Sequence, residues 1–305
     1  MLKVENLVVR FKSRVGVVRA VDGVNFDVVS GERFVFVGES GSGKTVLAMA
    51  LVRLLPNNAT VTGRVIFDGV DLLKLSEKEM RKVRNCKIAY IPQNQASLNP
   101  LMKVGYQCAE PLVEQGLERG RIMRKVSELL EFFGIGHRFK DYPHKLSGGM
   151  RQRALLVMGL SREPEMIIAD EPTKGLDAVK REQVVEAFQK LGRRTLMVIT
   201  HDLPFAEKVA DRIAVMYCGK IVEISPAREF FDCPLHPYSK GLLESLPERG
   251  MNPIKGFQPS LVNLPEGCRF RERCDLSTAR CAEEPPLLEV DGSLVRCWLY
   301  ADEMC

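Results

Sequence analysis

The chain has 305 residues, of which 45% are hydrophobic and 27% are charged, and its formal net charge is +5. This length accommodates one large domain with an appendage, or two domains. The composition is ordinary for a soluble globular protein, and so modest a charge gives no indication of a nucleic-acid partner. The longest apolar runs are far too short to cross a bilayer, and residues 1–5 do not resemble the start of a signal peptide.

The first thirty residues alternate between apolar and polar side chains. Apolar residues fall on every second position in residues 7–11 and again in residues 24–28, which predicts half-buried antiparallel strands. From Phe34 onward the pattern changes to continuous apolar runs separated by helical segments. Such runs predict strands covered on both faces, as in a parallel α/β sheet.

A glycine-rich loop follows the first of these runs. Residues 34–37 predict a strand that enters the loop, and residues 46–55 predict a helix that leaves it and ends before Pro56. The loop fits the phosphate-binding pattern G-x-x-x-x-G-K-[ST] at Gly38, Glu39, Ser40, Gly41, Ser42, Gly43, Lys44 and Thr45. Its backbone N–H groups suit phosphate oxygens, Lys44 adds a charge near the β and γ phosphates, and Thr45 offers a hydroxyl to Mg²⁺. The predicted ligand is therefore a nucleoside triphosphate with magnesium.

The middle of the chain, from Gly105 to Pro164, is predicted to be helical. Apolar residues recur at three- and four-residue spacing between residues 122 and 133, and Gly134 ends that helix. A second helix is predicted from Ser147, as its N-cap, to about Ser161. The glycines that follow Ser147 leave N–H donors exposed at a positive helix end, which suits a phosphate.

Polar side chains follow three further apolar runs. Asp170 and Glu171 come directly after residues 166–169, where ligands of open α/β sheets bind. The placement predicts that Asp170 helps hold Mg²⁺ and that Glu171 polarises the attacking water. His201 follows residues 196–200, and Gln93 follows residues 88–91, with Gln95 as a possible rival.

The cysteines are unevenly distributed. Of nine cysteines, five lie in the last 38 residues. Four of these, at intervals of five, six and fifteen residues, form a candidate ligand set: Cys268, Cys274, Cys281 and Cys297. Four thiolates suit either zinc or an iron–sulfur cluster, and the loose spacing favours the cluster, with unligated thiols as a third possibility. Cys305 is left over, while Cys86, Cys108 and Cys218 are interpreted as isolated packing residues.

The order of these motifs resembles that of the nucleotide-binding subunits of ATP-binding-cassette (ABC) transporters, over about residues 1–240. The resemblance rests on the phosphate loop and on residues 146–153, 166–172, 175–177 and 199–202. The tail, with Asp232–Tyr238 and the four cysteines, resembles the branch of ATPases that serve oligopeptide, dipeptide and nickel importers. This branch also favours a 4Fe–4S cluster at the cysteines.

The resemblance implies an α/β fold of the ABC-type P-loop ATPases. Its parts are a mixed or parallel core sheet, an antiparallel β subdomain, a helical subdomain at about residues 105–164 and a small cysteine-rich C-terminal extension. The nucleotide-binding domain would span residues 1–240, and residues 241–305 would form the extension with its linker.

The resemblance also assigns roles to residues. Glu171 and His201 become catalytic residues, and His201 reaches the γ-phosphate. Gln93 senses Mg²⁺ together with Thr45, and Phe11 stacks on adenine, although a strand phenylalanine is more often a core residue. Ser147 and Gly149 contact the ATP held by a second subunit, so the nucleotide lies between two chains.

The implied assembly contains a second, related but non-identical ATPase subunit, two transmembrane permease subunits and an extracytoplasmic solute-binding protein. The chain would lie peripherally on the cytoplasmic face of the cell membrane and hydrolyse ATP to import peptides. Three alternatives remain: a nickel or metal-chelate importer, a soluble cassette protein without a transport role, and a regulatory subunit that binds ATP without hydrolysis. Only 102 residues separate Lys44 from Ser147, so there is no room for the long insert typical of soluble cassettes.

One departure from the family pattern lies before Leu176. Lys174 and Gly175 stand where the family commonly has Ser-Ala. The segment crosses the expected subunit interface, so partner choice and site symmetry stay open.

Overall fold

The computed structural model describes residues 1–93 and 97–301. The chain divides into two compact units. One combines the N-terminal segment Met1–Lys74 with the C-terminal segment Thr200–Cys305, and the other is the central segment Leu75–Ile199. Gln95 and Cys305 lie outside the described residues.

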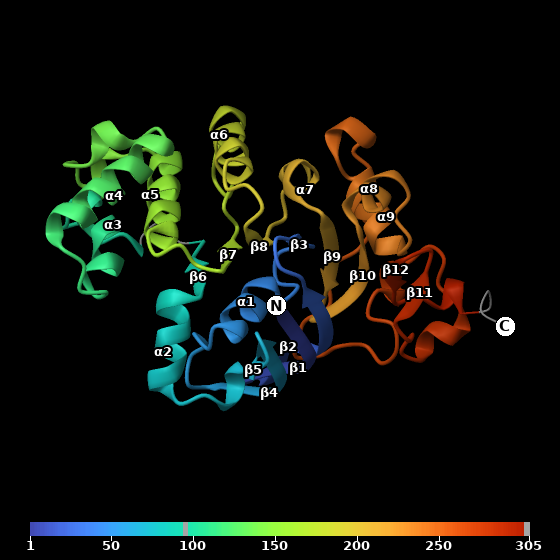
Figure 1. The fold of residues 1–305 in the computed structure, drawn as a ribbon. Helices are drawn as coiled ribbons and strands as arrows, with labels where there is room; N and C mark the ends of the chain where they lie inside the picture. The colour runs from blue at the N-terminus through green and yellow to red at the C-terminus, as the bar shows by residue number, and fades with distance from the viewer. Residues whose placement is uncertain (94–96, 302–305) are drawn as a thin grey trace. The chain divides into compact units, whose positions relative to one another are not determined.

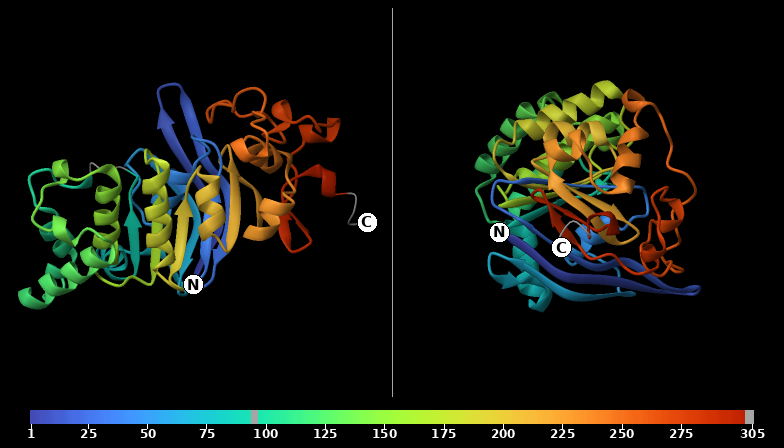
Figure 2. Two further views of the ribbon diagram at one scale, coloured as in Figure 1. Left: turned by 90° about the horizontal axis from the view of Figure 1, so that it is seen from above. Right: turned by 90° about the vertical axis from the view of Figure 1, so that its right-hand side faces the viewer.

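The first unit contains a four-stranded antiparallel sheet in the order β2-β1-β4-β5. Its strands are β1 (Leu2–Ser13), β2 (Gly16–Val28), β4 (Ala59–Phe67) and β5 (Val70–Asp71). β1 and β2 form the long hairpin drawn in dark blue in Figure 2. Leu7 lies opposite Val24 and Val4 lies opposite Phe26, and all four side chains are buried. The antiparallel strands predicted from alternation are therefore confirmed.

The same unit contains five strands of a mixed sheet, in the order β11-β12-β10-β9-β3. They are β3 (Arg33–Val37), β9 (Arg212–Tyr217), β10 (Lys220–Pro226), β11 (Leu288–Val290) and β12 (Ser293–Val295). β3 and β9 are parallel, whereas β10 pairs with its two neighbours in antiparallel fashion. Phe26, Phe34 and Phe36 join the two sheets, with ring centroids 5.0–5.7 Å apart. Burying each of these rings contributes roughly 1.5–3 kcal/mol to folding.

The helices of this unit are α1 (Lys44–Leu51), α7 (Leu203–Val209), α8 (Ala227–Asp232) and α9 (Pro237–Glu244). α1 ends four residues earlier than predicted. Arg53 adopts a left-handed conformation with φ of 52°, and the N–H of Leu54 donates to the carbonyl of Met49 at 2.9 Å. This is a Schellman-type end, which does not require the proline at position 56.

The second unit has three parallel strands in the order β8-β7-β6. They are β6 (Ile88–Ile91), β7 (Met166–Asp170) and β8 (Thr195–Ile199). Every residue of β7 and β8 is buried, as their continuous apolar sequences predict. Two further helices, α2 (Glu77–Cys86) and α6 (Ala178–Gln189), belong to this unit. Ser76 and Glu79 form a capping box that begins α2.

The predicted helical block also lies in the second unit. Figure 1 shows its three helices together in green: α3 (Val104–Val113), α4 (Arg119–Phe132) and α5 (Gly148–Leu160). Ile122, Val126 and Leu130 form the buried face of α4, and Gly134 follows it with φ of 69°. Ser147 is the N-cap of α5, as predicted. In the part of the chain that the structure describes, no helix is long and apolar enough to span a membrane.

The C-terminal segment contains a feature that the sequence patterns did not predict. β11 and β12 form a short hairpin, and β12 pairs with β10, so that Glu223 lies opposite Val295. The hydroxyl of Tyr300 donates to the carbonyl of Leu235 at 2.9 Å. The extension is thus built onto the edge of the mixed sheet rather than tethered by a free linker.

Candidate active site

The phosphate loop lies in the first unit, between β3 and α1. Gly38, Gly41 and Gly43 have φ values of 146°, 83° and 106°, a region that residues with a side chain rarely adopt. Lys44 is only 5% exposed, and its ammonium donates to the carbonyls of Gly38 at 2.7 Å and Glu39 at 2.9 Å. The loop therefore curls around the lysine.

The loop is closely held by its neighbours in the same unit. The N–H of Gly219, in the turn between β9 and β10, donates to the carbonyl of Ser42 at 2.8 Å. A Cβ placed on Gly43 would lie 2.1 Å from the carbonyl oxygen of Ala20 in β2. Such close backbone packing is possible only for glycine.

The start of α1 offers the groups that an anion requires. Gly43 is its N-cap and has no side chain to accept from the N–H groups of the first turn. These N–H groups and the positive end of the helix dipole suit phosphate oxygens. Thr45, in the first turn, is half-buried, and Ser40 is exposed.

Two predicted ligand residues from other strands lie in the first unit. Phe11, near the end of β1, is partly exposed rather than buried, and it lies opposite Val18 in β2. His201 is exposed and follows Thr200, whose N–H donates to the carbonyl of Phe36 in β3 at 2.9 Å. This bond places His201 at the end of β3 from which the phosphate loop departs.

The second unit places the paired acids at the carboxyl end of β7. Asp170 is 1% exposed and accepts a hydrogen bond from the hydroxyl of Tyr90 at 3.2 Å. Glu171 is 7% exposed and has φ of 49°, and its N–H donates to the carbonyl of Ile199 at 2.7 Å. A non-glycine residue with positive φ is strained, and such strain clusters at functional sites.

Tyr90 is a site residue that the sequence patterns missed. Burial, together with the neighbouring charge of Asp170, raises the pKa of its phenol above the ordinary value. The phenol thus stays protonated and donates to Asp170. The sequence does contain one indication of Tyr90, because its hydroxyl is the only polar side-chain group in the apolar run 88–91, just before Gln93. Gln93 is half-buried in the segment after β6.

Ser147 and Gly149 begin α5. The hydroxyl of Ser147 accepts from the N–H of Met150 at 3.3 Å, and the side chain of Ser147 is exposed. The turn before α6 contains Gly175, whose φ of 72° accounts for a glycine at this position. The side chain of Asp177 caps α6 by accepting from the N–H of Lys180 at 2.9 Å.

The four candidate cysteine ligands line one pocket of about 190 Å³ in the extension. Aromatic and apolar side chains such as Phe270, Leu276 and Trp298 share its wall with the polar residues His236, Thr278 and Arg280. Burial raises the pKa of Cys268 to about 11 and also raises the pKa values of Cys274 and Cys297. Because metals bind thiolates, a metal group entering this pocket has to displace protons.

The structure also bears on whether side chains could together hold one metal ion. Among residues 1–93 and 97–301, no group of three or more histidine, cysteine or acidic side chains is arranged to hold one metal ion. Of the cysteines interpreted as packing residues, Cys108 and Cys218 are buried. Cys86 is exposed at the end of α2, so that interpretation was wrong for Cys86.

Two family profiles match the chain. One, described as "ABC transporter", matches residues 21–174. The other, described as "Oligopeptide/dipeptide transporter, C-terminal region", matches residues 222–281, which include three of the four pocket cysteines.

Curated relatives match almost the whole chain. The "Dipeptide transport ATP-binding protein DppD" of Bacillus subtilis (strain 168) is 43% identical over 98% of this chain and 94% of its own length. The "Oligopeptide transport ATP-binding protein OppD" of the same organism is 41% identical over 98% of this chain and 88% of its own length. The protein of that name from Haemophilus influenzae is 39% identical over 99% and 98%, respectively.

The fold matches a solved structure described as "Dimeric structure of a post-hydrolysis state of the ATP-binding cassette MJ0796 bound to ADP and Pi". The TM-score is 0.68 at 27% identity, covering 75% of this chain and 99% of that chain. The predicted cassette fold is therefore confirmed. Given the matches along its length, the chain belongs to the ABC transporter ATPases, in the branch of the oligopeptide and dipeptide transporters.

Proposed function

We propose that this chain is an ATP-hydrolysing subunit of an ABC importer that takes up dipeptides or oligopeptides. The observation that carries the proposal is a phosphate loop curled around a buried Lys44, in a chain whose C-terminal region matches the peptide-transporter profile. We assign residues 1–240 to the cassette and residues 241–305 to the extension. The peptide substrate rests on the names of relatives that span nearly the full chain.

The residues of the cassette have distinct roles in this proposal. The phosphate loop and the N-terminus of α1 bind the triphosphate, with Lys44 as the cation near its terminal phosphates. Thr45, Gln93 and Asp170 hold Mg²⁺ directly or through its water shell. Bound Mg²⁺ neutralises charge on the phosphates.

Hydrolysis itself needs a water in line with the γ-phosphate. Glu171 orients and polarises this water, and His201 contacts the γ-phosphate. Phe11, which is partly exposed, stacks on the adenine. Ser147 and Gly149 contact the nucleotide bound by a second cassette, where the exposed hydroxyl and the N-terminus of α5 suit a phosphate.

The proposed assembly contains a second, related ATPase subunit, two membrane-spanning permeases and an extracytoplasmic solute-binding protein. The chain lies on the cytoplasmic face of the membrane through its contact with the permeases. The nickel importer, from the same branch, is the second candidate, since the cassette does not touch the transported solute.

Transport distinguishes these candidates. The complex would be purified with its permeases, reconstituted in lipid vesicles and supplied with its solute-binding protein. We expect dipeptides or oligopeptides to stimulate ATP hydrolysis several-fold, because substrate delivery drives closure of the cassette pair, and we expect nickel salts to have no effect. Stimulation by nickel alone would transfer the proposal to metal import. Failure to recover any membrane-spanning partner would favour a soluble cassette.

We further propose that Cys268, Cys274, Cys281 and Cys297 bind a 4Fe–4S cluster. All four cysteines line one pocket, and four thiolates are the number that a 4Fe–4S cluster needs, one for each iron. A cluster bound by these four residues would cross-link the extension. The cysteines would supply its four thiolates.

Metal analysis tests this proposal on the full chain purified without oxygen. We expect iron and acid-labile sulfide in equal amounts, about four of each per chain, and loss of both in Cys274→Ser. Cys233→Ser is the matched control, because Cys233 is an exposed cysteine that does not line the pocket. Stoichiometric zinc without iron would identify a zinc site instead, and metal-free protein would leave four unligated thiols.

A further inference from the structure

The segment between the first two pocket cysteines lies against the phosphate loop, within the same compact unit. The side chain of Arg273 is 6% exposed. Its two terminal nitrogens donate to the two carboxylate oxygens of Glu39, at 3.0 and 2.9 Å. Arg273 also donates to the carbonyl of Lys255 at 2.9 Å and to the hydroxyl of Tyr217 at 3.3 Å. A two-bond pair of this kind fixes orientation as well as distance.

An aromatic cluster adds a second contact with the same loop residue. Phe270 is buried, and its ring centroid lies 5.4 Å from those of both Tyr217 and Tyr238. The hydroxyl of Tyr238, in α9, accepts from the N–H of Glu39 at 2.8 Å. Phe270 thus supports the tyrosine that holds the backbone of the loop.

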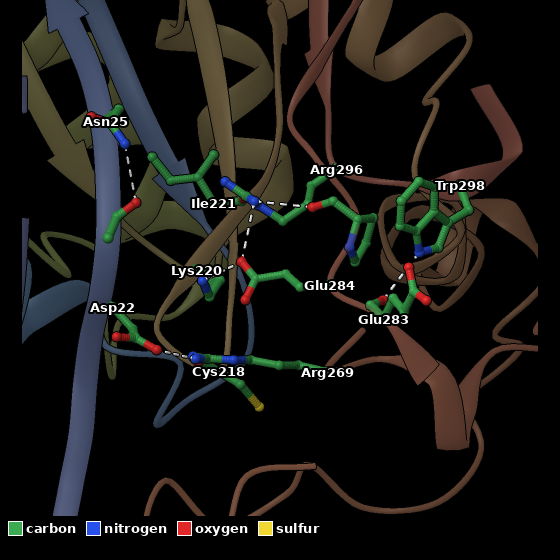
Figure 3. Close-up of polar contacts among 12 residues, drawn as sticks. Asp22, Asn25, Cys218, Lys220, Ile221, Arg269, Glu283, Glu284, Arg296 and Trp298 are labelled. Atoms are coloured by element: carbon green, nitrogen blue, oxygen red, sulfur yellow. Dashed lines mark hydrogen bonds and ion pairs between the residues drawn. The ribbon is translucent and has the colours of Figure 1, made fainter. Parts of the chain in front are cut away.

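A third contact passes through the turn between β9 and β10. Figure 3 shows Arg269 reaching toward Asp22 of β2 and Cys218, and its guanidinium donates to the Asp22 carboxylate and the Cys218 carbonyl. The next residue, Gly219, donates its N–H to the carbonyl of Ser42 at 2.8 Å. Its own carbonyl accepts from the N–H of Asp22 at 2.9 Å.

These contacts hold Glu39 on three sides. Arg273 binds its carboxylate, Tyr238 binds its N–H, and Lys44 donates to its carbonyl at 2.9 Å. The loop has three glycines with positive φ and few side chains of its own to pack, so its shape depends on such outside contacts. If these contacts served only to attach the extension, contacts to the strands would serve equally well.

We propose that Arg273, supported by Arg269 and Phe270, positions the phosphate loop, so that the C-terminal extension is part of the nucleotide site. These are positioning residues, because they act through Glu39 and Gly219 and not on the nucleotide. The proposal rests on the proposed function in one respect, namely that the loop binds nucleotide phosphates. It requires no particular occupant of the four-cysteine pocket.

Nucleotide binding to the full chain tests the proposal, with the magnesium complex of a non-hydrolysable ATP analogue as the probe. Loss of a charge-assisted contact that shapes a loop corresponds to about a tenfold weaker Kd. We expect this weakening in Arg273→Gln, a smaller one in Arg273→Lys, and a rise of similar size in the KM for ATP with kcat changed by less than about twofold. A fall in kcat with unchanged KM would contradict a positioning role in binding.

Arg271→Gln is the matched control. It removes the same charge from the same 3₁₀ turn, and Arg271 makes none of the contacts to Glu39, Lys255 or Tyr217 that the structure describes for Arg273. We expect its Kd to equal that of the unmodified chain. Glu39→Gln should weaken binding as Arg273→Gln does, and the double variant should be no weaker than either. Equal affinities for the Arg271 and Arg273 variants, or additive effects in the double variant, would overturn the proposal.

The thermodynamic coupling between nucleotide binding and the stability of the extension supplies an independent test that needs no variant. If the extension positions the loop, nucleotide binding must stabilise the extension by the same coupling. We expect the ATP analogue to slow amide hydrogen exchange in residues 268–274, while β11 and β12 exchange as before. Unchanged exchange at residues 268–274 would refute the inference. If the unmodified chain binds no nucleotide, it is the proposed function that fails.

Discussion

Replacing Glu171 by glutamine is expected to reduce the turnover number for Mg-ATP by at least about 100-fold. A positioned general base contributes roughly 10²–10⁴-fold to such a reaction, and the amide cannot take up a proton. Glu171 is 7% exposed and has a strained backbone with φ of 49°, a feature that clusters at functional sites. Affinity for ATP should be preserved, because Glu171→Gln leaves the phosphate loop intact. Steady-state hydrolysis and equilibrium binding measure the two quantities separately.

Glu165→Gln is a control for the loss of one carboxylate near the same strand. Glu165 precedes β7 and forms a partly exposed pair with Lys87 at 3.4 Å. Its replacement should leave turnover within about twofold, since an exposed pair contributes at most about 1 kcal/mol to stability. Hydrolysis by the Glu171 variant at a rate close to that of the control would remove Glu171 from catalysis.

The second large effect is expected from Gly43→Ala. The new methyl group would lie 2.1 Å from the carbonyl oxygen of Ala20 and 2.9 Å from Cε of Met216, so the loop or β2 has to move. Overpacking and the positive φ of 106° together cost about 2–5 kcal/mol of folding free energy. A displaced loop also loses its N–H contacts to phosphate, so binding of the ATP analogue should fall below detection. Thermal unfolding and calorimetric titration measure the two losses.

Gly69→Ala separates the clash from the strain of a left-handed backbone. Gly69, in the turn between β4 and β5, has φ of 81°, and apart from Gly69 itself and its two chain neighbours no described residue has a heavy atom within 4 Å of the added Cβ. We expect a loss of roughly 1–2 kcal/mol and normal nucleotide binding. If Gly43→Ala behaved like Gly69→Ala, the close packing of the phosphate loop on β2 would not matter for its shape.

Much of the nucleotide machinery was predictable because its signals are local. A glycine is favoured at a position with φ of 106° by backbone geometry, and the lysine beside it supplies the positive charge that phosphates require, so both show in the local sequence. The buried strands β7 and β8 were predictable for a similar reason, since burial on both faces leaves continuous apolar runs. The roles assigned to the individual site residues remain predictions.

Other features depend on contacts between segments far apart in the chain, which carry no local signal. Tyr90 meets Asp170 only because β6 and β7 pair in parallel. The three-residue strands β11 and β12 are too short for a periodic pattern, and β12 is stabilised by pairing with β10. α1 ends at a left-handed Arg53, although Pro56 is the stronger sequence signal.

The extension shows most clearly the difference between local sequence signals and contacts that depend on the tertiary structure. Its four cysteines, by their number and spacing, identified a candidate metal group, and the tertiary structure placed all four around one pocket. The pairing of Arg273 with Glu39 joins residues 234 positions apart, so no pattern in either segment could indicate it. The sequence by itself determined which chemical groups the chain carries, because each motif is formed by residues that are close together in the chain. Only the tertiary structure decided that the extension reaches the phosphate loop, because that contact depends on how β9, α9 and residues 268–274 pack together.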